Sequence, residues 1–430
     1  MNYSDFIKKN EDLVEIFRCF IKNKSEYNGI LSCLEGDFVI YHGIYAEKAP
    51  FKFTLHLIKS LFISKKYTLS KNNYGSETKN SFVTFVTAEN IYIENLKPII
   101  NELNDKGFKN DELRIGIEKH TSLKNVFNRN IDFSIVRFFI ENTKYLSYKN
   151  IIKLLYLKYI LYVDCKILIA YLNKNFPKNY SCFLSAEICD ALSRACALVS
   201  KTYGTKIILF QPGPFHYGEN PEVRSIICDE FIGWNQTKDY FLKYENIIRD
   251  ETCTVNFFDA IRYRNLSFKN IEKKYDIVFF LTWLNHGSPK DIINEQMDKV
   301  ISYILNKYDL NLYLKIHPAT DLIQEKEILT KYKNCSFIPK EKNSTKVISE
   351  SKMILNFGST VSFDADYLNV KTGIINFDNV IDDSHQFFSL TNVKNIMNIQ
   401  DLSIFIEDFN SQPNDKLNDN SIIEHIIKNL

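Results

Sequence analysis

Short runs of β-branched and aromatic residues alternate along this chain with longer segments in which apolar residues recur at helical spacing. A short apolar run between turn residues predicts a buried strand, and apolar positions three and four residues apart predict an amphipathic helix. Alternation of the two is typical of βαβ units, in which helices cover a parallel sheet. The pattern therefore predicts an α/β fold.

The first half of the chain contains five predicted strands and four predicted helices. The strands cover 37–41, 82–87, 113–117, 180–184 and 206–210, and the helices lie near 51–63, 91–106, 146–175 and 187–201. The helix 187–201 has the clearest pattern, because Gly204 follows it where a C-cap is expected.

The second half of the chain shows the same alternation of predicted strands and helices. Predicted strands cover 275–283, 311–317, 335–339, 352–357 and 372–377, and predicted helices lie near 290–307, 320–333, 344–350 and 361–368. Two sets of βαβ units predict two Rossmann-like domains facing a cleft. We expect an N-terminal domain over 1–240, a linker over 241–274 and a C-terminal domain over 275–430. The pattern leaves open which domain the last helix, 419–430, packs against.

Composition narrows the class of protein. The 430 residues, 45% of them hydrophobic and 25% charged, suit a globular chain with more than one core. A net charge of +2 predicts no nucleic-acid partner, so any anionic ligand must be held by a local site. Cysteines without a CxxC pair, an N-terminus without a signal-peptide core and the lack of any 18-residue apolar run predict a cytoplasmic protein.

The first candidate for chemistry is the strand that ends in Lys315-Ile316-His317-Pro318. Ligands of parallel sheets bind beyond the carboxyl ends of the strands, so this strand delivers His317 to such a place. Pro318 restricts the backbone as the chain leaves the strand, and Lys315 adds positive charge nearby. The alternative is a strand-terminal turn with an incidental histidine.

A second strand in the same half ends at Gly358-Ser359-Thr360 before a short predicted helix. Glycine allows the backbone to approach a ligand, and the hydroxyl groups lie beside free amides where an anion can bind. The alternative is that Ser359 or Thr360 only caps the helix. Because the two strands share one sheet, their ends together predict a site for the phosphate of one nucleotide.

The region 275–376 resembles bacterial glycosyltransferases of the two-Rossmann (GT-B) type, in the group of sialyltransferases, polysialyltransferases and capsule Kdo transferases. The His-Pro and Ser-Thr motifs of that group correspond to His317-Pro318 and Ser359-Thr360. The resemblance implies a CMP-activated nonulosonic or Kdo-type sugar acid as donor, and a surface glycan such as capsule or lipooligosaccharide as acceptor. It also implies that His317 and the hydroxyl pair hold the leaving phosphate.

The first half resembles this group less. Where sialyltransferases carry an acidic turn, this chain has Gln211-Pro212-Gly213. Gln211 and the amides around Gly213 can still line the cleft, as can Thr282 beside the donor. The departure leaves the general base open among Glu187, His216 and His42, in that order of preference. Glu187 can equally be a first-turn glutamate that interacts with a helix dipole.

Two further segments bear on cofactors and partners. Asp364-Ala365-Asp366 spells a DxD motif, but it falls inside a predicted helix, so we expect no metal and no cofactor apart from the nucleotide-sugar substrate. The segment 146–176 is rich in Tyr, Leu, Ile and Lys. It predicts either a buried helix pair with lysines reaching the surface or a membrane-surface patch suited to a lipid-linked glycan acceptor.

Other functions remain open at this point. The donor can be a UDP-sugar, as in other GT-B transferases or the similar UDP-sugar 2-epimerases. CDP-polyol phosphotransferases share a similar His-Pro strand. A nucleotide- or glycan-binding module without catalysis is the non-enzymatic alternative.

Overall fold

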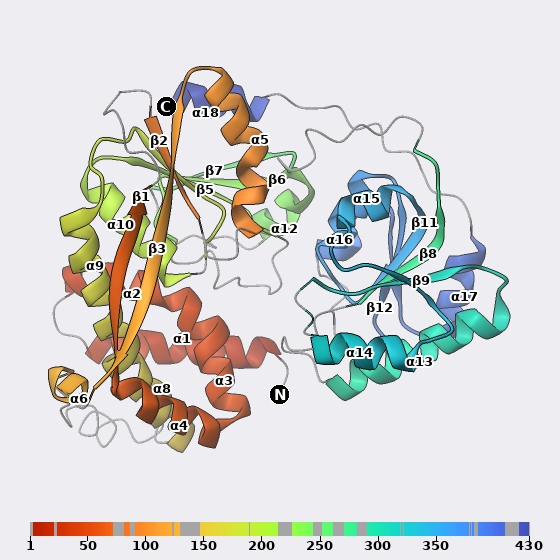
Figure 1. Cartoon of the computed structure of the whole chain (residues 1–430), viewed down its shortest axis with the longest axis horizontal. Helices are drawn as coiled ribbons and strands as arrows, with labels where there is room; N and C mark the ends of the chain where they lie inside the picture. Colours follow the sequence, from red (N-terminus) through yellow and green to blue (C-terminus); the bar gives the residue numbers. More distant parts are fainter. Residues whose placement is uncertain are drawn as a thin grey trace. The chain divides into compact units, whose positions relative to one another are not determined.

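A computed structural model shows two α/β units, each built around its own sheet (Figure 1). The described residues are 3–20, 24–71, 81–86, 91–122, 124–129, 147–188, 190–213, 226–243, 252–260, 271–281, 290–318, 320, 322–377, 379, 381, 386–408 and 421–429. The first unit comprises Met1–Pro212, Tyr217–Arg264 and Asp419–Leu430, and the second comprises Gly213–His216 and Asn265–Asn418. The prediction of an α/β chain with two Rossmann-like domains is confirmed.

The sheet of the first unit has seven strands in the order β1-β3-β2-β4-β5-β6-β7. The strands are β1 (Ile63–Lys71), β2 (Ser81–Phe85), β3 (Lys109–Thr121), β4 (Cys182–Ser185), β5 (Lys206–Phe210), β6 (Glu230–Trp234) and β7 (Thr254–Phe258). Only the pairing of β1 with β3 is antiparallel. Central strands such as β4 and β6 are buried along their whole length, as expected where helices cover both faces of a parallel sheet.

Helices α5 (Ile91–Asp105) and α18 (Ser421–Asn429) share a buried core with strands β2, β4, β5 and β6. Helices α9 (Val163–Asn175) and α10 (Ala191–Thr202) contact the sheet as well, and α10 packs on both α2 and α9. The other helical segments of this unit are α1 (Tyr3–Phe20), α2 (Lys24–Asp37), a π-helical turn (Phe38–His42), α3 (Gly43–Lys48), α4 (Pro50–Leu61), α6 (Lys124–Asn128), α8 (Tyr148–Tyr156), a π-helical segment (Leu157–Tyr162), a 3-10 turn (Asn235–Thr237) and α12 (Lys238–Lys243).

The strand predicted over 37–41 is wrong, because this segment is the π-helical turn between α2 and α3. Phe38 and Val39 are fully buried among helices, so packing overrides the strand propensity of these residues. The predicted helix 146–175 is present as α8, the π-helical segment and α9. More than half of its described aromatic and aliphatic side chains are buried, as the core interpretation of 146–176 expects, but the segment forms one continuous helical run and not a helix pair.

The second unit is a six-stranded parallel sheet in the order β10-β9-β8-β11-β12-β13. Its strands are β8 (Tyr275–Phe280), β9 (Leu312–Lys315), β10 (Ser336–Ile338), β11 (Ser351–Asn356), β12 (Lys371–Ile375) and β13 (Val393–Ile396). Numbered from β8, this is the order 3-2-1-4-5-6 of Rossmann domains.

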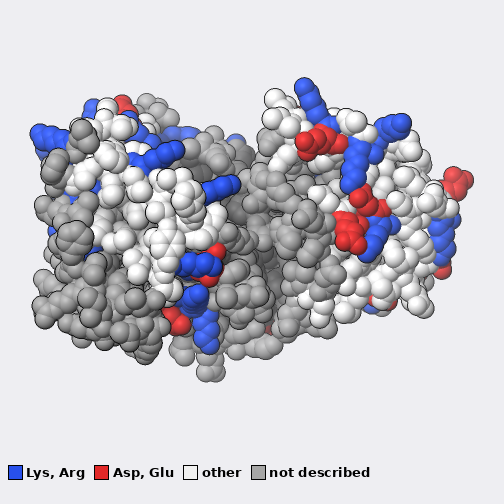
Figure 2. Space-filling model, turned by 90° about the horizontal axis from the view of Figure 1, so that it is seen from below, with Lys and Arg blue, Asp and Glu red and all other residues white. Residues whose placement is uncertain are grey.

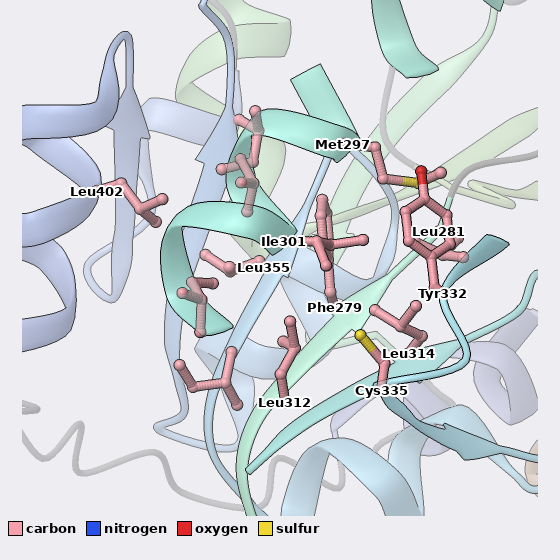
Figure 3. Close-up of a cluster of buried hydrophobic side chains, with 14 of the residues drawn as sticks. Phe279, Leu281, Met297, Ile301, Leu312, Leu314, Tyr332, Cys335, Leu355 and Leu402 are labelled. Carbon is pink, nitrogen blue, oxygen red and sulfur yellow. The ribbon is translucent and has the colours of Figure 1, made fainter. Parts of the chain in front are cut away.

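Helices cover both faces of this sheet. They are α13 (Lys290–Lys307), α14 (Leu322–Lys331), α15 (Ser344–Ser349), α16 (Val361–Tyr367), α17 (Ile399–Glu407) and a 3-10 turn (Gln386–Ser389). One core joins α13, α14 and α17 to the strands, with Phe279, Leu314 and Leu355 at its centre (Figure 3). A smaller core packs α15 and α16 against the opposite face.

Every strand and helix predicted between 290 and 377 is present, with ends shifted by a few residues. The structure differs around the expected domain boundaries. The range 241–274 contains β7, which pairs in parallel with β6 in the first sheet. Helix α18 belongs to the first unit rather than to the C-terminal domain, because Ile422, Ile423 and Ile426 fill the core beneath α5.

Charges of both signs lie on the face of the molecule shown in Figure 2, in keeping with the small net charge. Among the helices of the described residues, none is both long and apolar enough to cross a bilayer.

Candidate functional site

The second sheet has a switch point between β8 and β11, where the chain changes from building one side of the sheet to building the other. Phe280 pairs with Lys315 on β9, and Phe279 pairs with Leu355 on β11, so the three strands end level with one another. Ligands of Rossmann domains bind at the carboxyl ends of the strands beside such a point. The residues after β9 and β11 therefore lie on the same edge, two strand spacings or about 10 Å apart.

Asn356, the last residue of β11, shapes the turn at this edge. Its buried Oδ1 accepts hydrogen bonds from the Gly358 amide at 2.8 Å, the Ser359 amide at 2.9 Å and the Ser362 hydroxyl at 3.2 Å. Its Nδ2 is buried and has no hydrogen-bond partner among the described residues. Sequence reasoning missed Asn356, although Asn two residues before Gly is a known signal of a side-chain-supported turn.

Gly358 is required by this turn. Its φ of +75° lies in the left-handed region, and a Cβ there would lie 2.5 Å from Cδ1 of Ile381. The predicted need for glycine at this position thus has two causes, the backbone conformation and the close approach of the loop after β12.

The hydroxyl groups of Ser359 and Thr360 follow at the start of α16. Thr360 is the N-cap residue, but its side chain makes no capping hydrogen bond. The Ser359 amide is already bound by Asn356, and both side chains are only partly buried. The alternative in which Thr360 only caps the helix is therefore not what the structure shows. Helix α16 has seven residues, so the hydroxyl groups rather than a long helix dipole define this site.

His317 leaves the end of β9 as predicted. Its carbonyl accepts a hydrogen bond from the Thr320 amide at 3.0 Å, which closes a turn with Pro318 at the second position. Pro318 is exposed and the His317 side chain is half-buried, while Ile316 points into the core. The turn thus holds the imidazole at the same edge as Ser359 and Thr360.

Lys315 is placed differently from the prediction. Its side chain is 1% exposed, and Nζ donates to the carbonyl oxygens of Pro339 at 2.9 Å and Lys340 at 2.7 Å. Burial lowers the pKa of this ammonium group, and the charge of Glu341 acts in the opposite direction. Lys315 therefore anchors the loop after β10, which supports the edge but leaves little of the ammonium group for a ligand.

Glu187 follows β4 in the first unit. The chain order of this sheet reverses between β2 and β4, so Glu187 also lies at a switch point. It precedes α10 instead of opening it, because Asp190 is the N-cap and accepts from the Leu192 amide. Glu187 Oε1 accepts from the Asp190 amide at 3.0 Å, and the residue is 7% exposed. The first-turn interpretation of Glu187 is thus wrong, and the loop instead holds its carboxylate.

The Gln211-Pro212-Gly213 turn has a structural task. Gln211 Oε1 accepts from the Trp234 amide at 2.8 Å and from the Thr237 hydroxyl at 2.9 Å, which ties the end of β5 to the segment after β6. With its carbonyl oxygen bound twice and 3% exposed, Gln211 does not present this group to a ligand. Gly213 groups with the second unit, where a Cβ on it would lie 3.7 Å from the Thr360 hydroxyl oxygen.

His42 is not a strand-end residue, since it closes the π-helical turn before α3. Its ring lies 4.8 Å from the ring of Tyr156 and 6.5 Å from that of His56. His42 is therefore part of an aromatic cluster among helices and does not follow a strand, and this removes the reason for choosing it as a base. His216 and Thr282 lie outside the described residues.

Asp364 and Asp366 lie inside α16, as expected from the sequence. Both are buried, and Asp366 Oδ1 accepts from the Asn392 amide at 3.0 Å. Within the described part of the chain, no three His, Cys, Asp or Glu side chains are grouped as a metal site would require. The two aspartates of the DxD motif are thus part of the packing of α16. A metal-independent reaction stays a prediction.

No protein-family model matches this chain, and no curated protein matches it. Solved structures match in fold. The Methanocaldococcus jannaschii UDP-GlcNAc 2-epimerase in complex with UDP-GlcNAc and UDP is 13% identical, with a TM-score of 0.48 over 81% of this chain and 98% of that chain. S. aureus MnaA, solved with UDP, is 13% identical, with a TM-score of 0.50 over 81% and 95%. Arabidopsis thaliana UGT89C1 complexed with UDP-L-rhamnose is 9% identical, with a TM-score of 0.45 over 78% and 91%.

Identities of this size show the fold alone. The chain therefore has the GT-B type of fold, with two Rossmann-like units, that is also found in enzymes of nucleotide-sugar chemistry.

Proposed function

We propose that this chain is a glycosyltransferase whose second unit binds a nucleotide-sugar donor at the ends of β9 and β11. The observation that carries the proposal is the turn built by Asn356. It fixes Gly358, Ser359 and Thr360 at the switch point of a Rossmann sheet, and the Thr360 hydroxyl is not used as a helix cap. Hydroxyl and imidazole groups on one edge supply the donors that a phosphate needs.

The proposed chemistry needs two contributions. His317, Ser359 and Thr360 donate to the phosphate oxygen that accepts the electrons of the breaking anomeric C–O bond. A carboxylate takes the proton of the acceptor hydroxyl as its oxygen bonds to the anomeric carbon, and Glu187 is our candidate for that base. The acceptor is proposed to be a glycan or a lipid-linked glycan, at the inner face of the cytoplasmic membrane.

The nucleotide of the donor divides the proposal into two cases. The His317-Pro318 and Ser359-Thr360 motifs favour a CMP-activated sugar acid, by resemblance to the sialyltransferase and Kdo transferase group. The likeness in fold to S. aureus MnaA solved with UDP favours a UDP-sugar. Both cases use the same edge of the second sheet.

A thermal-shift panel with CMP, UMP, UDP, GDP and CDP tests the site and separates the cases. A ligand that binds only the folded chain raises its melting temperature, by an amount that grows with ligand concentration over Kd. We expect CMP to give the largest shift for a CMP-sugar donor and UDP for a UDP-sugar donor. No shift with any cytidine or uridine nucleotide would sink the proposal.

Two variants connect a shift to the proposed site. Thr360→Val removes the hydroxyl at nearly constant shape, and loss of one hydrogen bond to a charged phosphate weakens binding about 10- to 100-fold. Ser349→Ala is the matched control, because this partly buried serine of the same unit precedes β11 at the opposite edge of the sheet. Equal nucleotide affinity in both variants would place the ligand elsewhere.

Release of free nucleotide from a donor in the presence of acceptor glycans then tests the transferase activity itself. Nucleotide binding without turnover by any donor would favour the non-catalytic binding module. Conversion of a UDP-sugar without acceptor would favour an epimerase.

A further inference from the structure

Helix α4 has apolar residues on two opposite faces. Phe53, Leu57 and Ser60 form the face that is buried against the rest of the first unit. Phe51, Leu55 and Ile58 are 72%, 46% and 47% exposed. Spaced by four and three residues, they form one line along the other side of the helix. An ordinary surface helix carries polar residues there, so the second apolar line calls for an explanation.

Helix α8 extends this line. Tyr148 at the start of α8 is 55% exposed, and its hydroxyl lies 2.5 Å from the hydroxyl of Thr54 on α4. Tyr45 on α3 is 42% exposed, and its ring lies 5.6 Å from that of Phe53. Because Phe53 belongs to the buried face, Tyr45 lies beside this line and not in it. We call the four exposed side chains of the line the α4 face; it consists of Phe51, Leu55, Ile58 and Tyr148. Contiguous exposed apolar surface of this kind marks a site of protein or membrane contact.

The charges around the α4 face are positive. Lys52 and Lys59 on α4 are exposed, and the ranges 50–61 and 148–163 contain no Asp or Glu at all. The nearby Glu47 is 7% exposed and bound by the ammonium groups of three lysines, which outnumber its charge.

His56, on the same helix, reports this local charge. Burial lowers its pKa, and the positive charges of His42, Lys119, Lys59 and Lys65 lower it further. The charged groups with the largest effect on this imidazole include three lysines, which agrees with a positive potential beside the α4 face.

We propose that the α4 face binds the surface of an anionic phospholipid membrane, with Phe51, Leu55 and Ile58 entering the boundary between headgroups and acyl chains. A helix that lies in such a boundary combines aromatic and aliphatic residues on one side with lysines at the flank. Lysines beside an anionic membrane are attracted to it. Tyr148 has the amphipathic side chain that favours this depth.

A second copy of the chain fits the face less well. A twofold contact would bring Lys52 and Lys59 close to their own copies, and like charges in contact oppose association. Helix α14 offers a contrast within the molecule. Leu322 and Ile323 are 70% and 73% exposed, yet Glu325 and Glu327 follow them within five residues. Exposed apolar residues alone are thus not what distinguishes α4.

The test is co-sedimentation of the full chain with vesicles of phosphatidylcholine containing phosphatidylglycerol, and with vesicles of phosphatidylcholine alone. We expect binding to the anionic vesicles that weakens as salt is added. The variant Phe51→Gln/Leu55→Gln/Ile58→Gln should lower the partition coefficient at least about tenfold. The matched control Leu322→Gln/Ile323→Gln removes equally exposed residues from α14 and should bind like the unchanged chain.

Three outcomes would overturn the proposal. These are no binding to anionic vesicles, equal binding by the α4 variant with an unchanged melting temperature, and a dimer in size-exclusion chromatography that the α4 variant dissociates. The last result would assign the face to a second copy. Lys52→Gln/Lys59→Gln, which keeps the apolar line, should reduce binding to anionic vesicles and remove much of its salt dependence. The assay contains no nucleotide, so its result is independent of the proposed donor site.

Discussion

At the scale of single residues, the candidate site depends on side chains that shape backbone turns. Asn356 supplies three hydrogen bonds to the turn after β11, and Glu187 accepts an amide hydrogen bond in the loop after β4. These contacts fix Ser359, Thr360 and the Glu187 carboxylate before any ligand arrives. Preorganised groups of this kind are the ones that stabilise a transition state without first having to be reoriented.

The role of Glu187 can be tested with an isosteric change. Glu187→Gln keeps an oxygen to accept from the Asp190 amide but cannot take a proton, so we expect sugar transfer to fall about 10²- to 10⁴-fold with an unchanged melting temperature. Steady-state rates with saturating donor measure this. Glu118→Gln, an exposed carboxylate on β3, is the control. Transfer rates equal to those of the unchanged chain would remove Glu187 as the base.

A comparison of Gly358 with Gly204 separates the effect of backbone strain from the effect of a close side-chain contact. Gly358→Ala must adopt φ near +75° and also bring a Cβ to 2.5 Å from the flexible end of Ile381, whereas Gly204→Ala meets φ of +74° with nothing within 4 Å. In both variants, the left-handed backbone conformation of alanine should lower the free energy of unfolding by about 1 kcal/mol. Only Gly358→Ala should also weaken nucleotide binding. Denaturant unfolding and the nucleotide thermal shift, measured on both variants, give the comparison, and equal nucleotide shifts would contradict it.

At the scale of elements, helices α1, α3 and α8 converge on one buried carboxylate. Glu47 Oε2 lies 2.9 Å from Nζ of the fully buried Lys153, while Lys9 and Lys149 each approach Oε1 to 3.2 Å. Burial acts to raise the pKa of Glu47, but the three lysines outweigh it and lower the pKa from 4.5 to about 2. A buried pair of this kind is costly to break from one side.

This cluster predicts a pH dependence of stability. Because the folded-state pKa lies below the ordinary value, the stabilising contribution is complete above pH 4.5 and is lost as the pH falls towards 2. This lowering of the pKa corresponds to roughly 3 kcal/mol. Glu47→Gln should unfold more easily at neutral pH and show a flatter stability profile between about pH 4.5 and 2. Urea unfolding at several pH values measures both, and a parallel profile for the variant would contradict the assignment.

The sequence identified β8 to β12 and α13 to α16 of the second unit well, because these strands are short apolar runs between amphipathic helices, but it did not predict β13 or α17. The prediction failed over 37–41. Phe38 and Val39 are residue types with high strand propensity, but they are buried among helices, and only the tertiary structure determines that outcome. The prediction also missed the antiparallel strand β1, which includes the partly exposed Lys65 and the exposed Lys66. Polar edge strands lack the continuous apolar run that marks the central strands.

The candidate site was predictable in part. The ends of β9 and β11 were found because polar residues and glycine follow apolar strands. The directions of the side chains were not predictable. Lys315 and Gln211 are adjacent to the predicted site in sequence, but their polar groups form hydrogen bonds with neighbouring loops. Asn356 was overlooked because its residue type is common in this chain and its function appears only once the turn is formed.

At the scale of the whole molecule, the chain leaves the first unit after Arg264 and returns to it at Asp419. The returning segment is structural, because Ile422, Ile423 and Ile426 are at most 2% exposed and His425 pairs with the buried Glu230. The fold of the first unit therefore depends on residues from both ends of the sequence.

Removal of 419–430 tests this dependence. Loss of three buried isoleucines is expected to cost several kcal/mol, which is comparable with the net stability of a domain. We expect the first unit to melt at a much lower temperature, while the nucleotide-dependent shift of the second unit persists. Glu424→Gln/Lys428→Gln, which leaves the buried side of α18 unchanged, is the control. Calorimetry of both chains provides the measurement, and equal melting profiles would contradict the role of α18.

The position of α18 has a further consequence for how the protein is made. The ribosome completes all of 265–418 before it synthesises the helix that closes the core beneath α5. The first unit is thus completed last, and the part of its apolar core that α18 covers beside α5 stays exposed while the other unit can already fold. Nascent chains stalled before residue 419 should expose this part of the core to chaperones and proteases, and release of the last twelve residues should end that exposure.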